Sequence, residues 1–300
     1  MRNVFLFLVL ILFIPNAQAQ EKTKIDVVVT NSILADWVHN VGKDFVQVHA
    51  LVGPNGDVHT FEPTPKDSVA IVKAQAVINI GVGLEPWLKD LYKSSGSRAH
   101  RYTVAEGLDL IHLVKTQGVF RDEVDPHFWH DPTKVVWVIQ KIATALVNED
   151  PGNAQYYWEN ARSYLAELGQ LDEWIAKQVR KIPQERRKIV TSHDTFAYFG
   201  KRYGFQIVGS ILDSATTESA DPSALKITQL IEKIKTAGAP AIFLENVSNS
   251  KVTQAVAQET GVRLAPALYT DALSEPGTEA DTYLKMMTYN VLVFADALKK

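Results

Sequence analysis

The sequence predicts an α/β protein with two lobes, each built on a mainly parallel sheet, and one long helix that joins them. Runs of β-branched residues alternate with amphipathic helical segments toward both ends of the chain, as expected of parallel sheets whose two faces are covered. Between these regions, residues 153–181 show helical periodicity and contain no Pro. Charged and imidazole side chains follow several of the expected strands, which favours a site in the cleft between the lobes.

The first lobe is expected to alternate strands and helices from residue 25 onward. Residues 25–30 form a β-branched run that is typical of a buried strand. Asn31 or Ser32 can cap the helix that follows, because both side chains can accept a hydrogen bond from a free backbone N–H. The other elements expected here are strands at 45–51 and 76–81 and helices that begin at Pro65 and Pro132.

The stretch 153–181 is predicted to be one continuous helix. Its aromatic and aliphatic residues recur at helical spacing, and its only Gly is Gly169. At ~1.5 Å per residue, a helix of this length spans roughly 40 Å. An ordinary long helix inside one domain would show the same pattern. We favour a rigid strut between two lobes, because strand–helix alternation resumes after it.

The second lobe is expected to repeat the α/β pattern. Residues 188–191 form a strand that ends at His193, and residues 241–244 form a strand that ends at Glu245. The other strands are expected at 206–211 and 263–268, and the helices at 196–203, 223–236, 251–260 and 283–298. The expected domain division is a signal segment at 1–19, a first lobe at 20–152, a linking helix at 153–182 and a second lobe at 183–300.

The N-terminus has the pattern of a secretory signal peptide. Arg2 is followed by an apolar run from Val4 to Ile14, which is about half the length that a membrane-spanning helix needs. Residues 17–19, Ala-Gln-Ala, match a small-residue cleavage site. An uncleaved anchor is the alternative. We therefore expect a mature protein that begins near Gln20 and is located in the periplasm.

The composition excludes several classes of function. The 300-residue chain has 31 basic and 34 acidic side chains, for a formal net charge of −3, and loss of Arg2 with the signal makes it −4. This mild acidity, without a basic tract, argues against binding to nucleic acid. The Cys count is 0, so there is no disulfide, no thiolate ligand, no Cys nucleophile and no cysteine for lipid attachment. Any metal site must use His, Asp or Glu.

The candidate metal ligands lie far apart in the sequence and are His59, His127, His193 and Asp271. His193 directly follows a predicted strand, Asp271 follows the strand that ends near residue 268, and His59 lies in the loop after the second strand. Ligands of α/β sheets bind beyond the carboxyl ends of strands, so we expect these side chains to converge. Three imidazoles and one carboxylate suit a borderline divalent ion such as zinc.

His130 lies three residues after His127 and could reach the same ion if the segment formed a helical turn. Pro132 follows almost at once, however, and the residue before a Pro avoids the α region. We therefore place His130 outside the metal site. The other histidines, His39, His49, His100 and His112, lie in a helix, a strand and a polar, irregular stretch, and none is assigned to the site.

The four candidate ligands lie in the segments 56–65, 125–129, 191–199 and 268–273. In this order, the segments resemble the three histidine-type ligand loops and the carboxylate loop of the metal-binding substrate-binding proteins of zinc and manganese ABC importers, the cluster A-I periplasmic solute-binding family. Residues 83–87, Gly-Leu-Glu-Pro-Trp, and 240–245 also match in place and type. The resemblance covers essentially the whole mature chain.

The resemblance implies two α/β lobes joined by one rigid helix, with the ion in the cleft between them. By position, His59 and His127 would come from the first lobe, and His193 and Asp271 from the second. Family members with His at the third position tend to bind zinc and those with Glu manganese, so His193 favours zinc. Many zinc members also carry a His-rich loop before the second ligand, whereas residues 113–124 contain no His here. Manganese, alone or together with zinc, is therefore the alternative cargo.

The chemistry of the donors also favours zinc. Three neutral imidazoles and one carboxylate match its tetrahedral coordination, whereas manganese favours more oxygen ligands. Acceptors behind the imidazoles should orient them. The candidates for this role are Glu62, Asp125, Asp194, Glu218 and Glu245.

The function that the resemblance implies is a periplasmic receptor, not an enzyme, that binds zinc and delivers it to the membrane permease of an ABC importer. A monomer is expected, and a metallochaperone is a further partner that could load the site. One alternative is an exported zinc hydrolase with an open ligand position for water, although the chain contains no H-E-x-x-H and no G-x-S-x-G motif. A receptor for a chelate or small organic ligand is a third hypothesis, which would not need three converging histidines.

Overall fold

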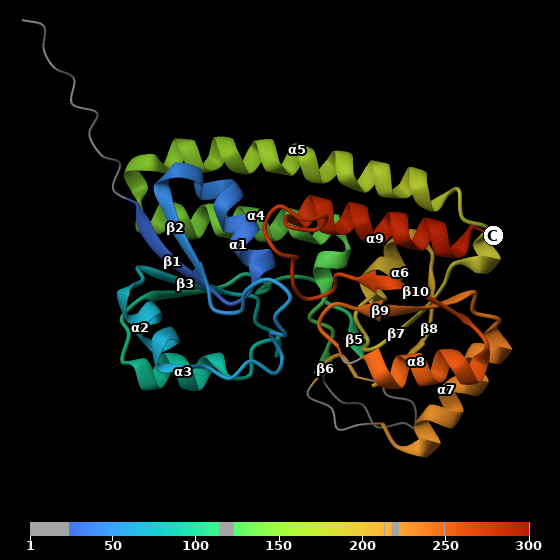
Figure 1. Ribbon diagram of the computed structural model, residues 1–300. Coiled ribbons are helices and arrows are strands. Elements are labelled where there is room, and N and C mark those ends of the chain that lie inside the picture. Colours follow the sequence, from blue (N-terminus) through green and yellow to red (C-terminus); the bar gives the residue numbers. More distant parts are fainter. Residues whose placement is uncertain (1–23, 114–122, 213, 218–221, 249, 300) are drawn as a thin grey trace, which may run out of the picture.

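The computed structural model describes residues 24–113, 123–212, 214–217, 222–248 and 250–299, so the predicted signal segment at 1–19 lies outside the described residues. The chain forms two α/β lobes, and one long helix, α5 (Ala154–Val179), runs along both of them (Figure 1). The two-lobed α/β fold with a single joining helix is therefore confirmed. Within the described part of the chain, no helix combines the length and the apolar character needed to cross a membrane.

The first lobe contains a four-stranded parallel sheet in the order β2-β1-β3-β4. Its strands are β1 (Ile25–Val29), β2 (Val46–Ala50), β3 (Ala76–Asn79) and β4 (His100–Thr103). The helices α2 (Pro65–Lys73) and α3 (Leu88–Ser95) cover one face, and α1 (Ser32–Gly42) and α4 (Pro132–Glu149) cover the other (Figure 1). Burial on both faces explains why β1 is a β-branched run rather than an alternating one.

Local capping signals fix where these helices begin. The Asn31 side chain accepts a hydrogen bond from the Leu34 N–H at 2.9 Å, as an N-cap should. Thr64 and Asp67 form a capping box in front of α2, with Pro65 in the first turn. Asp131 accepts from the Thr133 N–H at 2.9 Å and starts α4 directly after the segment that carries His127.

The second lobe has the same strand arrangement as the first. Its strands β7 (Lys188–Thr191), β8 (Gln206–Ser210), β9 (Ala241–Glu245) and β10 (Arg263–Leu268) form the parallel pairs β7–β8 and β9–β10. Contact between β7 and β9 places the strands in the order β8-β7-β9-β10. The helices α7 (Ala224–Ala237) and α8 (Ser250–Thr260) cover one face, and α6 (Ala197–Tyr203) and α9 (Tyr283–Leu298) cover the other (Figure 1).

The lobes share one hydrophobic core along α5. A single cluster of buried apolar side chains extends from Val27 in β1, through Leu168 in the joining helix, to Phe294 in α9. The buried residues of α5 recur at helical spacing from Tyr157 to Val179, as the sequence pattern predicts. A shared core of this kind resists large hinge motion, because separating the lobes would expose apolar surface.

The expectation of an irregular stretch around His100 is wrong, because His100 begins strand β4. Strand β4 lies at the edge of its sheet and pairs with β3 alone, with His100 opposite Ala76. An edge strand that is largely exposed needs no alternation of apolar and polar residues. The sequence of β4 therefore lacks the periodicity that would predict a strand. The short antiparallel pair β5 (His112–Leu113) and β6 (Glu123–Val124) was also not predicted.

Candidate metal centre

The four predicted ligand candidates meet where the two lobes face each other. His59, His127, His193 and Asp271 each offer a donor atom, and these atoms lie within 4.8 Å of one another. All four residues are buried, with at most 1% of their surface exposed. His59 follows β2, His193 follows β7 and Asp271 follows β10, so the site collects side chains at the carboxyl ends of parallel strands.

The distances between donors suit a tetrahedral cation. The Nε2 atom of His127 lies 3.4 Å from that of His59 and 3.3 Å from that of His193. The Asp271 carboxylate oxygens lie 3.1 to 3.6 Å from the three imidazole Nε2 atoms. Zinc bonds of about 2.0–2.1 Å in a tetrahedron would place neighbouring donors about 3.4 Å apart. The four side chains therefore outline a coordination site of this size.

Buried polar atoms at the centre also favour a cation. Neither oxygen of the Asp271 carboxylate makes a hydrogen bond of regular geometry, and the Nδ1 atom of His59 makes none either. Buried polar atoms are normally paired, and each unpaired one needs an explanation. A cation between Asp271 and the imidazoles would satisfy the carboxylate.

His59 is held mainly through its backbone. Asp57 Oδ1 accepts a hydrogen bond from the His59 N–H at 2.9 Å, and Trp87 Nε1 donates to the Val58 carbonyl at 2.7 Å. The Trp87 ring contacts Phe61 edge-on at 4.8 Å. These contacts place the irregular loop after β2 so that the His59 Nε2 atom faces the centre.

His127 is fixed by a local carboxylate. Asp125 Oδ1 accepts from the His127 backbone N–H at 2.9 Å and lies 2.7 Å from its Nδ1 atom. Tyr198 in α6 donates its hydroxyl hydrogen to the Asp125 carbonyl at 2.8 Å, which ties this segment to the second lobe. An acceptor at Nδ1 places the proton there and leaves Nε2 free for a cation.

His193 is fixed by a carboxylate from a neighbouring strand. Glu245, at the end of β9, accepts from the backbone N–H groups of Ser192 and His193 at 2.6 and 3.0 Å. Its second oxygen lies 2.5 Å from His193 Nδ1. Since β7 and β9 lie side by side, Glu245 sits directly behind the ring and orients Nε2 toward Asp271.

The Asp271 loop is held by both lobes. Trp129, two residues after His127, donates its indole N–H to the Thr270 carbonyl at 2.8 Å. Ser32, at the start of α1, accepts from the Leu273 N–H at 2.9 Å. The carboxylate belongs to the second lobe, but side chains of the first lobe position its loop.

Charge at the centre follows from burial and pairing. Burial acts to lower the pKa of His193, but the carboxylates of Glu245 and Asp271 raise that pKa well above its ordinary value. Burial acts to raise the pKa of Asp271, but His193 and His127 hold it well below its ordinary value. The carboxylate is therefore ionised, and a cation that binds here must displace a proton from His193.

His130 lies outside the group, as predicted, but the predicted reason is wrong, because residues Phe128–His130 do form a 3-10 helical turn. Its ring lies 4.3 Å from that of Phe196, and its Nε2 atom lies 3.3 Å from the Thr195 hydroxyl. Burial is the largest of the effects that lower its pKa to about 3, so the ring is neutral. His130 is a core histidine beside the centre.

Of the predicted orienting acids, Asp125 and Glu245 each contact a ligand candidate. Glu62 is exposed, the backbone N–H of Asp194 donates to the Ser214 carbonyl, and Glu218 lies outside the described residues. Asp57 was not singled out from the sequence, although its place two residues before His59 is a recognisable local turn signal. Its partner Thr217 lies 160 residues away and has no such signal.

Comparisons with known proteins agree with this geometry. A family model described as "Zinc-uptake complex component A periplasmic" matches residues 27–297. The manganese-binding lipoprotein MntA of Halalkalibacterium halodurans is 34% identical over 274 residues, which cover 91% of this chain and 88% of MntA. The manganese ABC transporter substrate-binding lipoprotein PsaA of Streptococcus pneumoniae is 31% identical over 305 residues, which cover 98% of this chain and 97% of PsaA.

Solved structures show the same architecture. The periplasmic zinc-binding protein TroA from Treponema pallidum matches with a TM-score of 0.85 and 27% identity, over 92% of this chain and 100% of TroA. A manganese-bound periplasmic metal-binding protein from Candidatus Liberibacter asiaticus matches with a TM-score of 0.81 and 27% identity, over the same shares of the two chains. The chain therefore belongs to the zinc-uptake complex component A family, the metal-binding substrate-binding proteins of ABC importers.

Proposed function

We propose that this protein is a periplasmic receptor that binds zinc and delivers it to the permease of an ABC importer. The observation that carries the proposal is the buried group of three imidazoles and one carboxylate between the lobes. The proposed ligands are His59, His127, His193 and Asp271. Membership of a family of substrate-binding proteins supports transport rather than catalysis.

The donor set is the reason for naming zinc first. His127 Nε2 lies 3.3 to 3.4 Å from the other two imidazole nitrogens, and the Asp271 oxygens lie 3.1 to 3.6 Å from all three. This donor set suits a tetrahedral ion, whereas manganese favours more oxygen ligands. The second candidate is a manganese or mixed receptor. It is supported by the relatives MntA and PsaA, whose names refer to manganese, and it has equal support from the family as a whole.

A hydrolase has no comparable support. A catalytic zinc needs an open ligand position with bound water. The four side chains are all buried and all converge, and the relatives are named as binding proteins of transporters.

The proposal includes the location and the division of the chain. The relatives named as lipoproteins of ABC transporters support a position outside the cytoplasm. We propose a signal peptide at 1–19, a first lobe at 20–152, a linking helix at 153–182 and a second lobe at 183–300. We also propose that the receptor meets the permease as a monomer, with or without a metallochaperone that loads the site.

The decisive experiment is a competition titration on the purified, chelator-stripped mature protein, with zinc and manganese measured in parallel. Stoichiometric zinc binding with much weaker manganese binding is the expected result. Comparable affinities would establish the mixed receptor instead. A protein that binds neither ion tightly would overturn the assignment of the site.

A further inference from the structure

We propose that Asp57 and Thr217 form a latch between the two lobes that positions His59 and sets the rate at which the bound ion leaves. The proposal rests on the metal-binding function proposed above and adds a release step to it. In this proposal His59 leaves the ion first, whereas His127, His193 and Asp271 stay in place.

His59 is the least anchored of the three imidazoles. The Nδ1 atoms of His127 and His193 each lie within hydrogen-bond distance of a carboxylate, at 2.7 and 2.5 Å. Within the part of the chain that the structure describes, the Nδ1 atom of His59 has no such partner. A carboxylate behind a ligand histidine fixes its ring and raises its basicity, and the His59 ring lacks this support.

The anchors of the other two imidazoles also stay within one lobe. Asp125 lies in the same segment as His127, and Glu245 belongs to the same lobe as His193. A small change in the distance between the lobes would therefore leave each carboxylate beside its ring, and the link from Tyr198 to the second lobe goes to the Asp125 backbone carbonyl rather than to its carboxylate.

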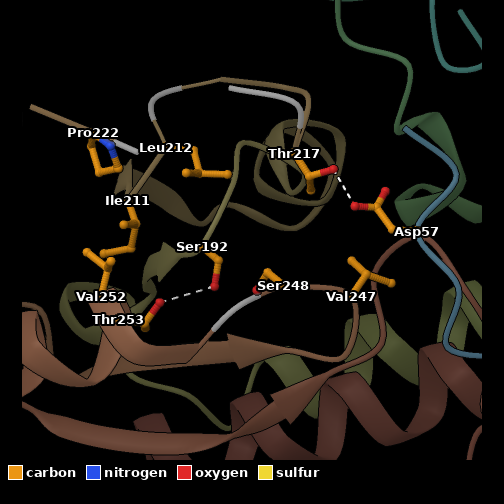
Figure 2. A pocket seen from close by; sticks show the side chains of 10 residues that line it. All are labelled: Asp57, Ser192, Ile211, Leu212, Thr217, Pro222, Val247, Ser248, Val252 and Thr253. Atoms are coloured by element: carbon orange, nitrogen blue, oxygen red, sulfur yellow. Dashed lines mark hydrogen bonds between the residues drawn. The ribbon is translucent and has the colours of Figure 1, made fainter. Parts of the chain in front are cut away.

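His59 depends on the opposite lobe instead. Asp57 Oδ1 accepts from the His59 backbone N–H, and Asp57 Oδ2 accepts from the Thr217 hydroxyl at 2.5 Å. Thr217 lies between β8 and α7 in the second lobe (Figure 2). One carboxylate thus joins the backbone of a ligand residue to the other lobe.

A hollow lies beside the latch, between Asp57 of the first lobe and residues of the second lobe. Its volume is about 180 Å³, and among the described residues that line it Asp57 belongs to the first lobe. Ser192, Val247 and Thr253, all from the second lobe, lie around the same hollow (Figure 2). The Asp57–Thr217 hydrogen bond therefore borders this hollow, and its loss removes a polar contact between the lobes.

A backbone hydrogen bond from the Asn55 N–H to the Leu273 carbonyl, at 2.8 Å, holds the start of the same loop against the Asp271 loop. The loop is therefore attached to the second lobe by the Asn55–Leu273 backbone hydrogen bond, which stays in place, and by the Asp57–Thr217 hydrogen bond, which can break. When the Asp57–Thr217 hydrogen bond opens, the His59 ring can turn away from the other three ligands, while Trp87 still holds the Val58 carbonyl beside it. A three-coordinate ion then accepts water or a new ligand at the open position.

The test uses Thr217→Val, which removes the hydroxyl and keeps the size of the side chain. Zinc release is measured by stopped flow into excess chelator, or manganese release if the titration favours manganese, together with the association rate and the melting temperature of the metal-free protein. A hydrogen bond to a charged group is strong enough to change a rate by about tenfold. We expect release about tenfold faster than in the wild type, with an unchanged association rate and a melting temperature lowered by only a few degrees.

Thr228→Val is the matched control. Thr228 is an exposed residue of α7 whose hydroxyl donates to the Ala224 carbonyl within its own helix. This variant should release the ion at the wild-type rate. Asp57→Asn combined with Thr217→Val should be little faster than Asp57→Asn alone, because the two residues act through one contact.

A wild-type release rate in Thr217→Val, with tight binding in the wild-type protein, would overturn the latch and leave the receptor function intact. Strictly additive effects of the two substitutions would also overturn it. A wild-type protein that binds neither metal would overturn the receptor function, and the latch with it.

Discussion

Glu85 and Glu245 each tie strand ends together in one lobe, but only Glu245 also contacts a proposed metal ligand. Glu85 accepts from the Thr30 hydroxyl at 2.7 Å and from two backbone N–H groups after β3 at 2.8 and 2.9 Å. Glu245 accepts from two backbone N–H groups after β7, from the Thr270 hydroxyl at 3.4 Å and from His193 Nδ1. Glu85 therefore has a structural role alone, whereas Glu245 has the same structural role and also orients a proposed metal ligand.

Glu245→Gln is expected to weaken metal binding by about 10–100-fold, because the His193 ring loses the charged acceptor that orients it. Competition titration with a chelator of known affinity measures the change. Glu85→Gln is the matched control, and its metal affinity should stay close to that of the wild type. Equal losses of affinity in the two variants would contradict a ligand-orienting role for Glu245.

His193→Ala is expected to reduce metal affinity by at least about 100-fold without unfolding the protein, since one of four donors is removed from a site that the remaining structure still holds. The stabilisation that metal adds to the wild type, seen as a rise in melting temperature, should disappear with it. Calorimetric titration and thermal unfolding with and without zinc measure both effects. His39→Ala, at an exposed position in α1, is the control. Undiminished affinity in His193→Ala would remove His193 from the ligand set.

Asp36→Asn is expected to change how stability depends on pH. Asp36 in α1 accepts from the Tyr283 N–H of α9 at 3.1 Å and from the Tyr164 hydroxyl of α5 at 3.3 Å, with Asn40 and Lys43 nearby. Burial, partly offset by these hydrogen bonds, raises its pKa from 3.8 to about 6.

The sign of this effect follows from the raised pKa. The folded protein holds the Asp36 proton more tightly than the unfolded chain, so this group stabilises the fold below pH ~4 and loses that contribution as the pH rises through about 6. Relative to the wild type, Asp36→Asn should therefore gain about 2–3 kcal/mol in free energy of unfolding between pH 4 and pH 7.5. Urea unfolding across this range measures the gain, with the exposed Asp44→Asn as control. A constant difference between variant and wild type would refute the assignment.

Tyr283→Phe is expected to lower the free energy of unfolding by about 1–3 kcal/mol. The Tyr283 hydroxyl donates to the Trp129 carbonyl at 2.6 Å, and both residues are buried. Loss of the hydroxyl leaves that carbonyl without this donor, in the segment that carries His127. Urea denaturation measures the loss. Tyr289→Phe, on the same helix and only partly buried, should change stability much less.

Much of the architecture could be predicted from the sequence because its causes are local. Helical periodicity in 153–181 and the break before Pro151 locate α5, and Asn31 caps α1 through a contact three residues away. The Asp125–His127 contact spans two residues, so that orienting acid was among the candidates. The edge strand β4 was not predicted, because exposed residues lack the apolar pattern on which strand predictions depend.

The sequence by itself determined which residue types are available for a metal, and the strand ends where they would lie. Only the tertiary structure decided that β7 and β9 lie side by side, so that Glu245, rather than Glu62, stands behind an imidazole. It also decided that Asp57 meets Thr217 across 160 residues of chain. These contacts depend on how two separately folded sheets face each other along α5, and packing of that kind leaves no periodic or local mark in the order of residues.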